Sequence, residues 1–97
     1  MPEFLMVFRP KRDNFIETMN TEEMSVMGQH AEHCQRLFSE GKLVLSGVCL
    51  DGTYGIVVFR AKSEESARQF FNNDPAVQAG IVNVELHPFR IGMLQCS

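Results

Sequence analysis

The stretch LVLSGVCLDGTYGIVVFRA, residues 43–61, decides the fold because it predicts two neighbouring antiparallel strands. Residues 43–48 and 54–61 are rich in apolar and β-branched residues, and Asp51-Gly52 between them is typical of a hairpin turn. The centre of the second strand is apolar at both odd and even positions, as in strands that are covered on both faces. The stretch therefore predicts a hairpin within a sheet that is buried on two sides.

Helical patterns flank this hairpin. Over residues 22–40, apolar side chains recur at helical spacing: Met24, Met27, Ala31, Cys34 and Phe38. Thr21 is the expected N-cap of this helix, and Gly41 is its expected stop. After the hairpin, Ser63 is expected to cap a second helix that buries Ala67, Phe70 and Phe71. Asp74-Pro75 then predicts a short third helix over 75–79, because Asp is a favoured N-cap and Pro a favoured first helical residue.

Two further strands complete the pattern. FLMVF at residues 4–8 is apolar on both faces and is closed by Arg9-Pro10, and IVNVELHPF at 81–89 is the last strand. Residues 10–20 are polar, PKRDN at 10–14 is expected to form a turn or loop, and 90–97 are weakly specified. The order β-α-β-β-α-β predicts one α+β domain over residues 1–97 of ferredoxin-like type, with two helices on one face of a four-stranded antiparallel sheet.

The other face of such a sheet also needs a cover, because its strands are apolar on both sides. A second subunit packed sheet to sheet supplies one, so we expect a homodimer. A single sheet with one partly exposed face is the alternative.

Composition excludes several classes of function. The 97 residues carry a net charge of −3, and the nine Lys and Arg are spread without a basic stripe, which disfavours nucleic-acid binding. No apolar run approaches the ~18 residues of a membrane span. Three widely spaced Cys, at positions 34, 49 and 96, favour reduced thiols and a cytoplasmic location. No phosphate-binding glycine loop is present, so no organic cofactor is expected.

Several motifs together resemble a known family. In order they are HAEHCQRLFSEGKLVLSG (30–47), DGTYGIVVF (51–59), SEESARQFF (63–71), NDPAVQAGI (73–81) and HPF (87–89). The set is similar to the YciI-like, or YCII-related, proteins of the dimeric α+β-barrel superfamily, and it runs from about Met1 to Phe89. Val48 stands where the family often has Pro, and the loop over residues 48–53 is short. His33 and Cys34 are not part of the family pattern.

The resemblance implies a ferredoxin-like subunit and a homodimer whose two sheets form a barrel. It also implies a cleft that holds a helix His and the Asp of the DP turn, which are His30 and Asp74 here. The family is similar in fold to muconolactone isomerases, and the implied activities are of lyase or isomerase type, including dehydrohalogenation of hydroxylated aromatics.

The sequence pattern by itself leaves two interpretations open for His30 and two for Asp74. At about 100° per residue, His30 falls about 40° from Cys34, at the border of the predicted apolar stripe. It is either a general acid/base or a half-buried His bonded to a carbonyl. Asp74 is explained by N-capping alone, yet one of its oxygens can cap while the other orients an imidazole.

The neighbours of His30 have simpler interpretations. Helical phase predicts that His33 is a solvated surface residue and that Cys34 is a small hydrophobe of the core. A metal site from His30, His33 and Cys34 would need a fourth ligand such as His87, so no metal is expected. Ser46-Gly47 either contacts a ligand or simply ends a strand, and Arg9 either binds an anionic substrate or is solvated.

The sequence therefore favours a small enzyme of lyase or isomerase type, in which a His30–Asp74 pair performs acid/base chemistry on a small, cyclic, polar metabolite. The alternative is a non-catalytic module that binds a small ligand in the same pocket.

Overall fold

The structure, a computed structural model, describes residues 1–95. Its elements are β1 (Glu3–Pro10), α1 (Phe15–Thr18), α2 (Thr21–Ser39), β2 (Leu43–Val48), β3 (Gly55–Arg60), α3 (Glu64–Asn72), α4 (Pro75–Gln78) and β4 (Val82–Phe89). The predicted β-α-β-β-α-β order is confirmed, and so is the predicted short helix after Asp74, which is α4. The short helix α1 is an addition to the prediction. Cys96 lies outside the described residues.

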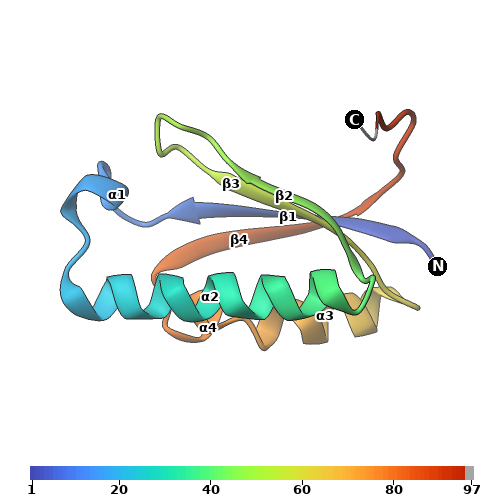
Figure 1. Cartoon of the computed structure of the whole chain (residues 1–97), viewed down its shortest axis with the longest axis horizontal. Coiled ribbons are helices and arrows are strands. Elements are labelled where there is room, and N and C mark those ends of the chain that lie inside the picture. The colour runs from blue at the N-terminus through green and yellow to red at the C-terminus, as the bar shows by residue number, and fades with distance from the viewer. Residues whose placement is uncertain (96–97) are drawn as a thin grey trace.

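The four strands form one antiparallel sheet in the order β2-β3-β1-β4, as a ferredoxin-like fold requires. β1 is central, so that Leu5 pairs with Val58 of β3 on one side and His87 of β4 on the other. The helices α2, α3 and α4 lie along one face of this sheet, as Figure 1 shows. The predicted α+β class is confirmed.

The core lies between the sheet and these helices. Phe4, Met6 and Phe8 alternate along β1 and point to the helical side, where they join buried side chains of β3. Phe59 of β3 is fully buried and its ring packs against those of Phe4 and Phe70. Burying each such ring stabilises the fold by roughly 1.5–3 kcal/mol.

The opposite face of the sheet is apolar as well. Leu5 and Val7 of β1 and Ile56 and Val58 of β3 point to this side, where they line a shallow depression together with Phe89, Ile91, Met93 and Leu94. Figure 1 shows the C-terminal segment on the side of the sheet away from the helices. The prediction that β1 and β3 carry apolar side chains on both faces of the sheet is therefore confirmed.

The start of α2 differs from the prediction by one residue. Asn20, not Thr21, is the N-cap: its side-chain oxygen accepts from the Glu23 N–H at 2.8 Å, and the Glu23 carboxylate accepts from the Asn20 N–H at 3.0 Å. This reciprocal capping box needs Glu or Gln three residues after the cap, which Asn20 has and Thr21 lacks. Arg12 donates to the same Glu23 carboxylate at 2.9 Å.

The segment over 10–20 is also more ordered than expected. Pro10 pairs with Val82, so β1 continues beyond the predicted end at Phe8. Its pairing with β3 stops at Phe8, so Pro10 has a strand on one side only, where a missing N–H is tolerated. The predicted turn is present over residues 11–14. Helix α1, which follows it and buries Phe15, was not predicted because four residues are too few to show periodicity.

Candidate active site

His30 lies in the middle of the buried face of α2. That face carries four residues at helical spacing: Val26, His30, His33 and Leu37. Met27 and Cys34 flank it. Met24 and Phe38, by contrast, are 56% and 58% exposed. The true stripe is thus rotated by roughly 80° from the predicted one, at about 100° per residue. The prediction of its position was wrong because Met27, Ala31, Cys34 and Phe38 line a cavity, and side chains that face a cavity are as apolar as those of the core.

His30 and Asp74 are in direct contact. The imidazole Nδ1 lies 2.7 Å from Oδ2 and 2.8 Å from Oδ1 of the carboxylate, so its N–H donates to both oxygens. The Asp74 side chain is 0% exposed and that of His30 is 19% exposed. The ring of Phe8 packs edge-on against the imidazole, with centroids 5.2 Å apart. These contacts fix the ring with Nδ1 towards the protein interior.

Asp74 also caps α4, as its sequence context predicted. Its Oδ1 accepts from the Ala76 N–H at 2.9 Å, and Pro75 occupies the first turn, where no backbone donor is needed. The buried carboxylate therefore holds a helix and an imidazole at once. Capping alone does not explain Asp74.

His30 is protonated at neutral pH. Burial lowers the pKa of His30, but the hydrogen bond to the Asp74 carboxylate, the contact with Cys34 and the negative charge of Asp74 outweigh burial and raise this pKa to about 10. The resting form is an imidazolium that faces a carboxylate, with Nε2 as the second N–H donor.

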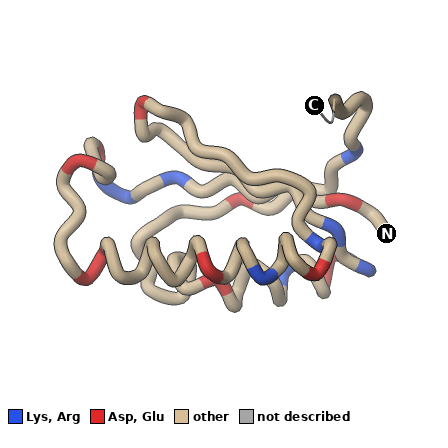
Figure 2. The backbone as a smooth tube through the Cα atoms, in the orientation of Figure 1, with Lys and Arg blue, Asp and Glu red and all other residues tan. Residues whose placement is uncertain are grey.

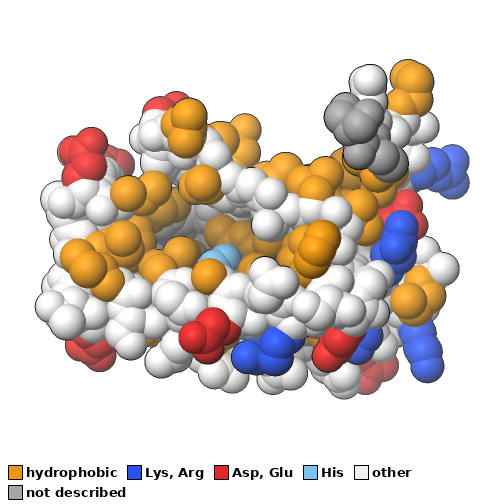
Figure 3. Space-filling view, in the orientation of Figure 1, with side chains coloured by type: hydrophobic (Ala, Val, Ile, Leu, Met, Phe, Trp, Pro, Cys, Tyr) orange, Lys and Arg blue, Asp and Glu red, His pale blue; other side chains and the backbone are white. Residues whose placement is uncertain are grey.

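A cavity of about 870 Å³ opens between α2 and the β2–β3 hairpin, with His30 in its wall. Figure 3 shows it as a hollow surrounded by hydrophobic side chains, with a histidine at its floor. Its walls come mainly from α2, β2, β3 and the segment around α1; among the lining residues are Phe8, Phe15, Ile16, Met27, Ala31, Cys34, Phe38, Leu43, Ser46, Gly47, Val48, Tyr54 and Ile56. A space of this size suits a small cyclic ligand.

The cavity lining contains no Lys, Arg, Asp or Glu among the described residues. Figure 2 shows the charged positions along α2, at turns and at strand ends. His30 is therefore the cationic group that a ligand meets in this part of the chain. Inside apolar walls, a single positive charge interacts strongly with an oxygen that carries negative charge.

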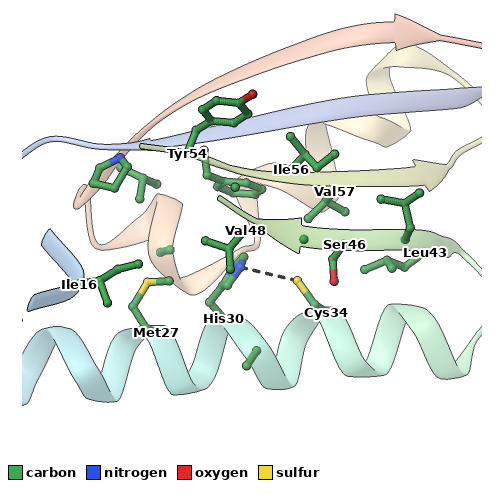
Figure 4. A pocket seen from close by; sticks show the side chains of 18 of the residues that line it. Ile16, Met27, His30, Cys34, Leu43, Ser46, Val48, Tyr54, Ile56 and Val57 are labelled. Atoms are coloured by element: carbon green, nitrogen blue, oxygen red, sulfur yellow. Dashed lines mark hydrogen bonds between the residues drawn. The ribbon is translucent and has the colours of Figure 1, made fainter. Parts of the chain in front are cut away.

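Cys34 lies beside the outward nitrogen of His30. Its Sγ is 3.8 Å from Nε2, one helical turn along α2, as Figure 4 shows. Donor atoms of His30, Cys34 and Asp74 lie within 4.8 Å of one another, which is close enough to hold a metal ion. However, the Asp74 oxygens already accept hydrogen bonds from His30 and Ala76. Within this cluster, His30 Nε2 and Cys34 Sγ are then left as metal ligands, whereas zinc takes four. The cluster is better described as a hydrogen-bonded Cys–His–Asp row.

The other candidate residues divide between two faces of the sheet. Ser46 and Gly47 line the cavity, and Figure 4 shows the Ser46 hydroxyl pointing from β2 towards α2. Arg9 lies on the far face, where it forms an ion pair with Glu85 at 3.0 Å and stacks over the Tyr54 ring. His87 is exposed and contacts the same carboxylate at 3.3 Å. The structure brings neither Arg9 nor His87 to the cavity.

His33 is not the solvated residue that we predicted. It is half-buried, and its Nε2 is buried without a hydrogen-bond partner in the described part of the chain. The error follows from the misplaced apolar stripe. Sequence reasoning also missed Ile16 of α1, which lines the cavity, because a helix of four residues carries no periodic signal.

Fold and site together define a class: a ferredoxin-like α+β domain with a buried His–carboxylate pair at the floor of an apolar cavity. The model of the YCII-related domain matches residues 3–90, and the chain belongs to this family. No curated protein matches the sequence.

Among solved structures, the chain is similar to 5-chloro-2-hydroxyhydroquinone dehydrochlorinase (TftG) from Burkholderia phenoliruptrix, in complex with 2,5-dihydroxybenzoquinone. The TM-score is 0.69 at 18% identity, over 92% of this chain and 95% of that one. At this identity the likeness establishes the shared fold. None of the helices in residues 1–95 combines the length and apolarity needed to cross a bilayer.

Proposed function

We propose that this protein is an enzyme of lyase or isomerase type in which His30 and Asp74 move a proton on a small cyclic metabolite. The observation that carries the proposal is the orientation of the imidazole. A fully buried carboxylate holds Nδ1, and the other edge of the ring borders an apolar cavity. A pair so arranged fixes the imidazole and stabilises its protonated form.

The charge of His30 sets the direction of the first proton transfer. With a pKa raised to about 10, the imidazolium is present at neutral pH, so His30 begins as an acid or as a hydrogen-bond donor. It gives its Nε2 proton to an oxyanion that forms on the substrate, and the imidazole, which is then neutral, takes a proton back later in the reaction. Asp74 keeps Nδ1 protonated throughout.

The positive charge of His30 in apolar walls favours a phenolic or enolic substrate. The Nε2–H group of the imidazolium donates to such an oxygen and stabilises the negative charge that develops there. Apolar walls accept the ring, while the Ser46 hydroxyl and the backbone at Gly47 are proposed to contact its polar groups. Arg9 has no part in this proposal, because it lies on the other face of the sheet.

Dehydrohalogenation of a hydroxylated ring is the reaction that we favour within this class. In such an elimination a ring hydroxyl loses its proton and the carbon that carries the halogen gains one, which gives a keto form. The halide then leaves with the electrons of its bond as a second hydroxyl loses its proton, and a quinone results. His30 is proposed to exchange the proton at oxygen. The fold shared with a dehydrochlorinase that acts on a chlorinated hydroxyhydroquinone supports testing this reaction first.

The test is chloride release from 5-chloro-2-hydroxyhydroquinone, together with binding of 2,5-dihydroxybenzoquinone measured by calorimetry. His30→Gln should reduce turnover by about 10²–10⁴-fold while part of the quinone binding remains. His87→Gln is the matched control, because His87 is exposed and remote from the cavity. Turnover that is undiminished in His30→Gln would reject the acid/base assignment.

A non-catalytic binding module is the second candidate, favoured by a cationic group in walls that hold no Lys or Arg over residues 1–95. In that case the imidazolium would hold an anionic ligand without reacting. Tight quinone binding that depends on His30, with no product formed from any of a panel of halogenated phenols, would favour this candidate.

A further inference from the structure

The Cys34 thiol lies next to the proposed acid/base pair of His30 and Asp74. Cys34 Sγ lies 3.8 Å from His30 Nε2, and His30 Nδ1 lies 2.7 Å from the buried Asp74 carboxylate. Both Cys34 and His30 line the cavity. Any proton that enters or leaves Nε2 therefore moves next to the sulfur.

This order of groups activates a cysteine. A nucleophile, a base in hydrogen-bond reach of it and a third group that orients the base recur in enzymes on unrelated folds, and they are recognised by geometry. The thiolate is the reactive form of cysteine, and a neighbouring imidazolium stabilises it. Asp74 contributes by holding the ring so that Nε2 faces the sulfur.

We propose that Cys34 is a nucleophile that adds covalently to conjugated carbonyl compounds in the cavity, with His30 as its proton partner and Asp74 as a positioning residue. The proposal rests on the same His–Asp pair as the proposed function, and it assigns to that site a second chemistry and a class of ligand.

The addition balances with water as the proton carrier. The Cys34 thiol first gives its proton to water, because Nε2 of the imidazolium already carries one, and the positive charge of His30 stabilises the thiolate as it forms. The thiolate forms a C–S bond to the β-carbon, and the C=C π electrons move to the carbonyl oxygen to give an enolate. His30 Nε2 delivers its proton to the enolate, which becomes the saturated carbonyl adduct after tautomerisation, and His30 then regains a proton from water.

The surroundings favour this electrophile over others. The cavity walls are apolar, which suits an uncharged ring or alkene, and the enolate oxygen that forms can be protonated by His30. Cys34 and its donor lie on one helix, four residues apart, so their geometry does not depend on a loop.

Cys49 provides a control within the same molecule. It follows β2 in the hairpin turn and is half-buried like Cys34, but it does not line the cavity, and its thiol has no hydrogen bond in the described part of the chain. The two thiols therefore compare a cysteine with and without an imidazole neighbour.

The experiment is alkylation of the native protein with N-ethylmaleimide, a conjugated carbonyl compound, at pH 7, followed by mass spectrometry of the separated peptides. Cys34 should react at least about tenfold faster than Cys49. His30→Gln should bring its rate to that of Cys49, and Asp74→Asn should lower it part of the way. In urea, which unfolds the protein, Cys34 and Cys49 of the wild type should be alkylated at equal rates.

Two results would overturn the inference: Cys34 reacting no faster than Cys49, or a rate at Cys34 that His30→Gln leaves unchanged. The wild-type comparison stands even if a variant is unstable, since both thiols are in one molecule. Equal labelling rates with His30-dependent turnover would reject this inference alone. Rapid His30-dependent labelling without turnover of any halogenated phenol would instead reject the proposed function alone.

Discussion

His30 and Asp74, 44 positions apart in the sequence, form an ion pair with 2.7 Å between Nδ1 and Oδ2. One partner comes from the middle of the longest helix and the other from the turn that begins α4. The packing of α2 on α4 is therefore what assembles the site, and this contact explains why a buried carboxylate is tolerated.

The ion pair makes stability depend on pH. Because folding raises the pKa of His30 from about 6.5 to about 10, its contribution to stability is complete below about pH 6.5 and is lost as the pH rises to about 10. The free energy of unfolding of the wild type should fall over this window relative to that of His30→Gln. Urea denaturation at pH 6, 8 and 10 measures the difference. If the difference in free energy of unfolding between the wild type and His30→Gln stayed the same from pH 6 to pH 10, the raised pKa of His30 would be contradicted.

Substitutions at Asp74 should separate its two roles. Asp74→Asn keeps an N-cap for α4 but removes the charge that faces His30, and Asp74→Ala removes both. We expect Ala to cost about 1 kcal/mol more stability than Asn, while both variants lower the pKa of His30 equally. Chemical denaturation and NMR titration of the imidazole measure the two effects. Equal stability of the two variants would show that capping by Asp74 is unimportant.

Val48 should be a point at which the cavity can be narrowed without harm to the fold. Its side chain is 60% exposed and lines the cavity at the end of β2, and Figure 4 shows it pointing towards α2. Val48→Trp should leave the midpoint of thermal unfolding nearly unchanged and weaken binding of a cavity ligand by at least about tenfold. Arg9→Ala, on the other face of the sheet, should leave that binding unchanged. Unaltered binding in Val48→Trp would place the ligand elsewhere.

The apolar face of the sheet that lies away from the helices should be a dimer interface. Leu5 and Ile56 on this face are only half-buried by the chain itself, although their neighbours are apolar. Light scattering at micromolar concentration should give a mass of twice 11.0 kDa. Leu5→Lys should shift it to the monomer while the helical circular dichroism is kept, since the core side of β1 is untouched. A wild-type monomer would contradict this prediction.

Much of the fold followed from local patterns. Alternating apolar strands, the Asp51-Gly52 turn and the cap at Ser63 predicted the order and the approximate bounds of the main elements, because these signals depend on residues close in sequence. The cap at Asn20 was also readable from its spacing to Glu23, although Thr21 competed with it. Helix α1 was missed because four residues carry no period.

The sequence by itself determined the ferredoxin-like order, and the resemblance of its motifs to the YCII-related family indicated His30 and Asp74 as candidate residues of the site. Only the tertiary structure decided how α2 is turned against the sheet, which places His30 centrally, buries part of His33 and brings Cys34 to the cavity. It also placed Arg9 on the opposite face from His30. The physical reason is that apolar side chains are equally suited to a core and to a cavity, so their pattern does not fix which of the two a helix faces. That choice depends on the contacts of α2 with elements that are remote in the sequence.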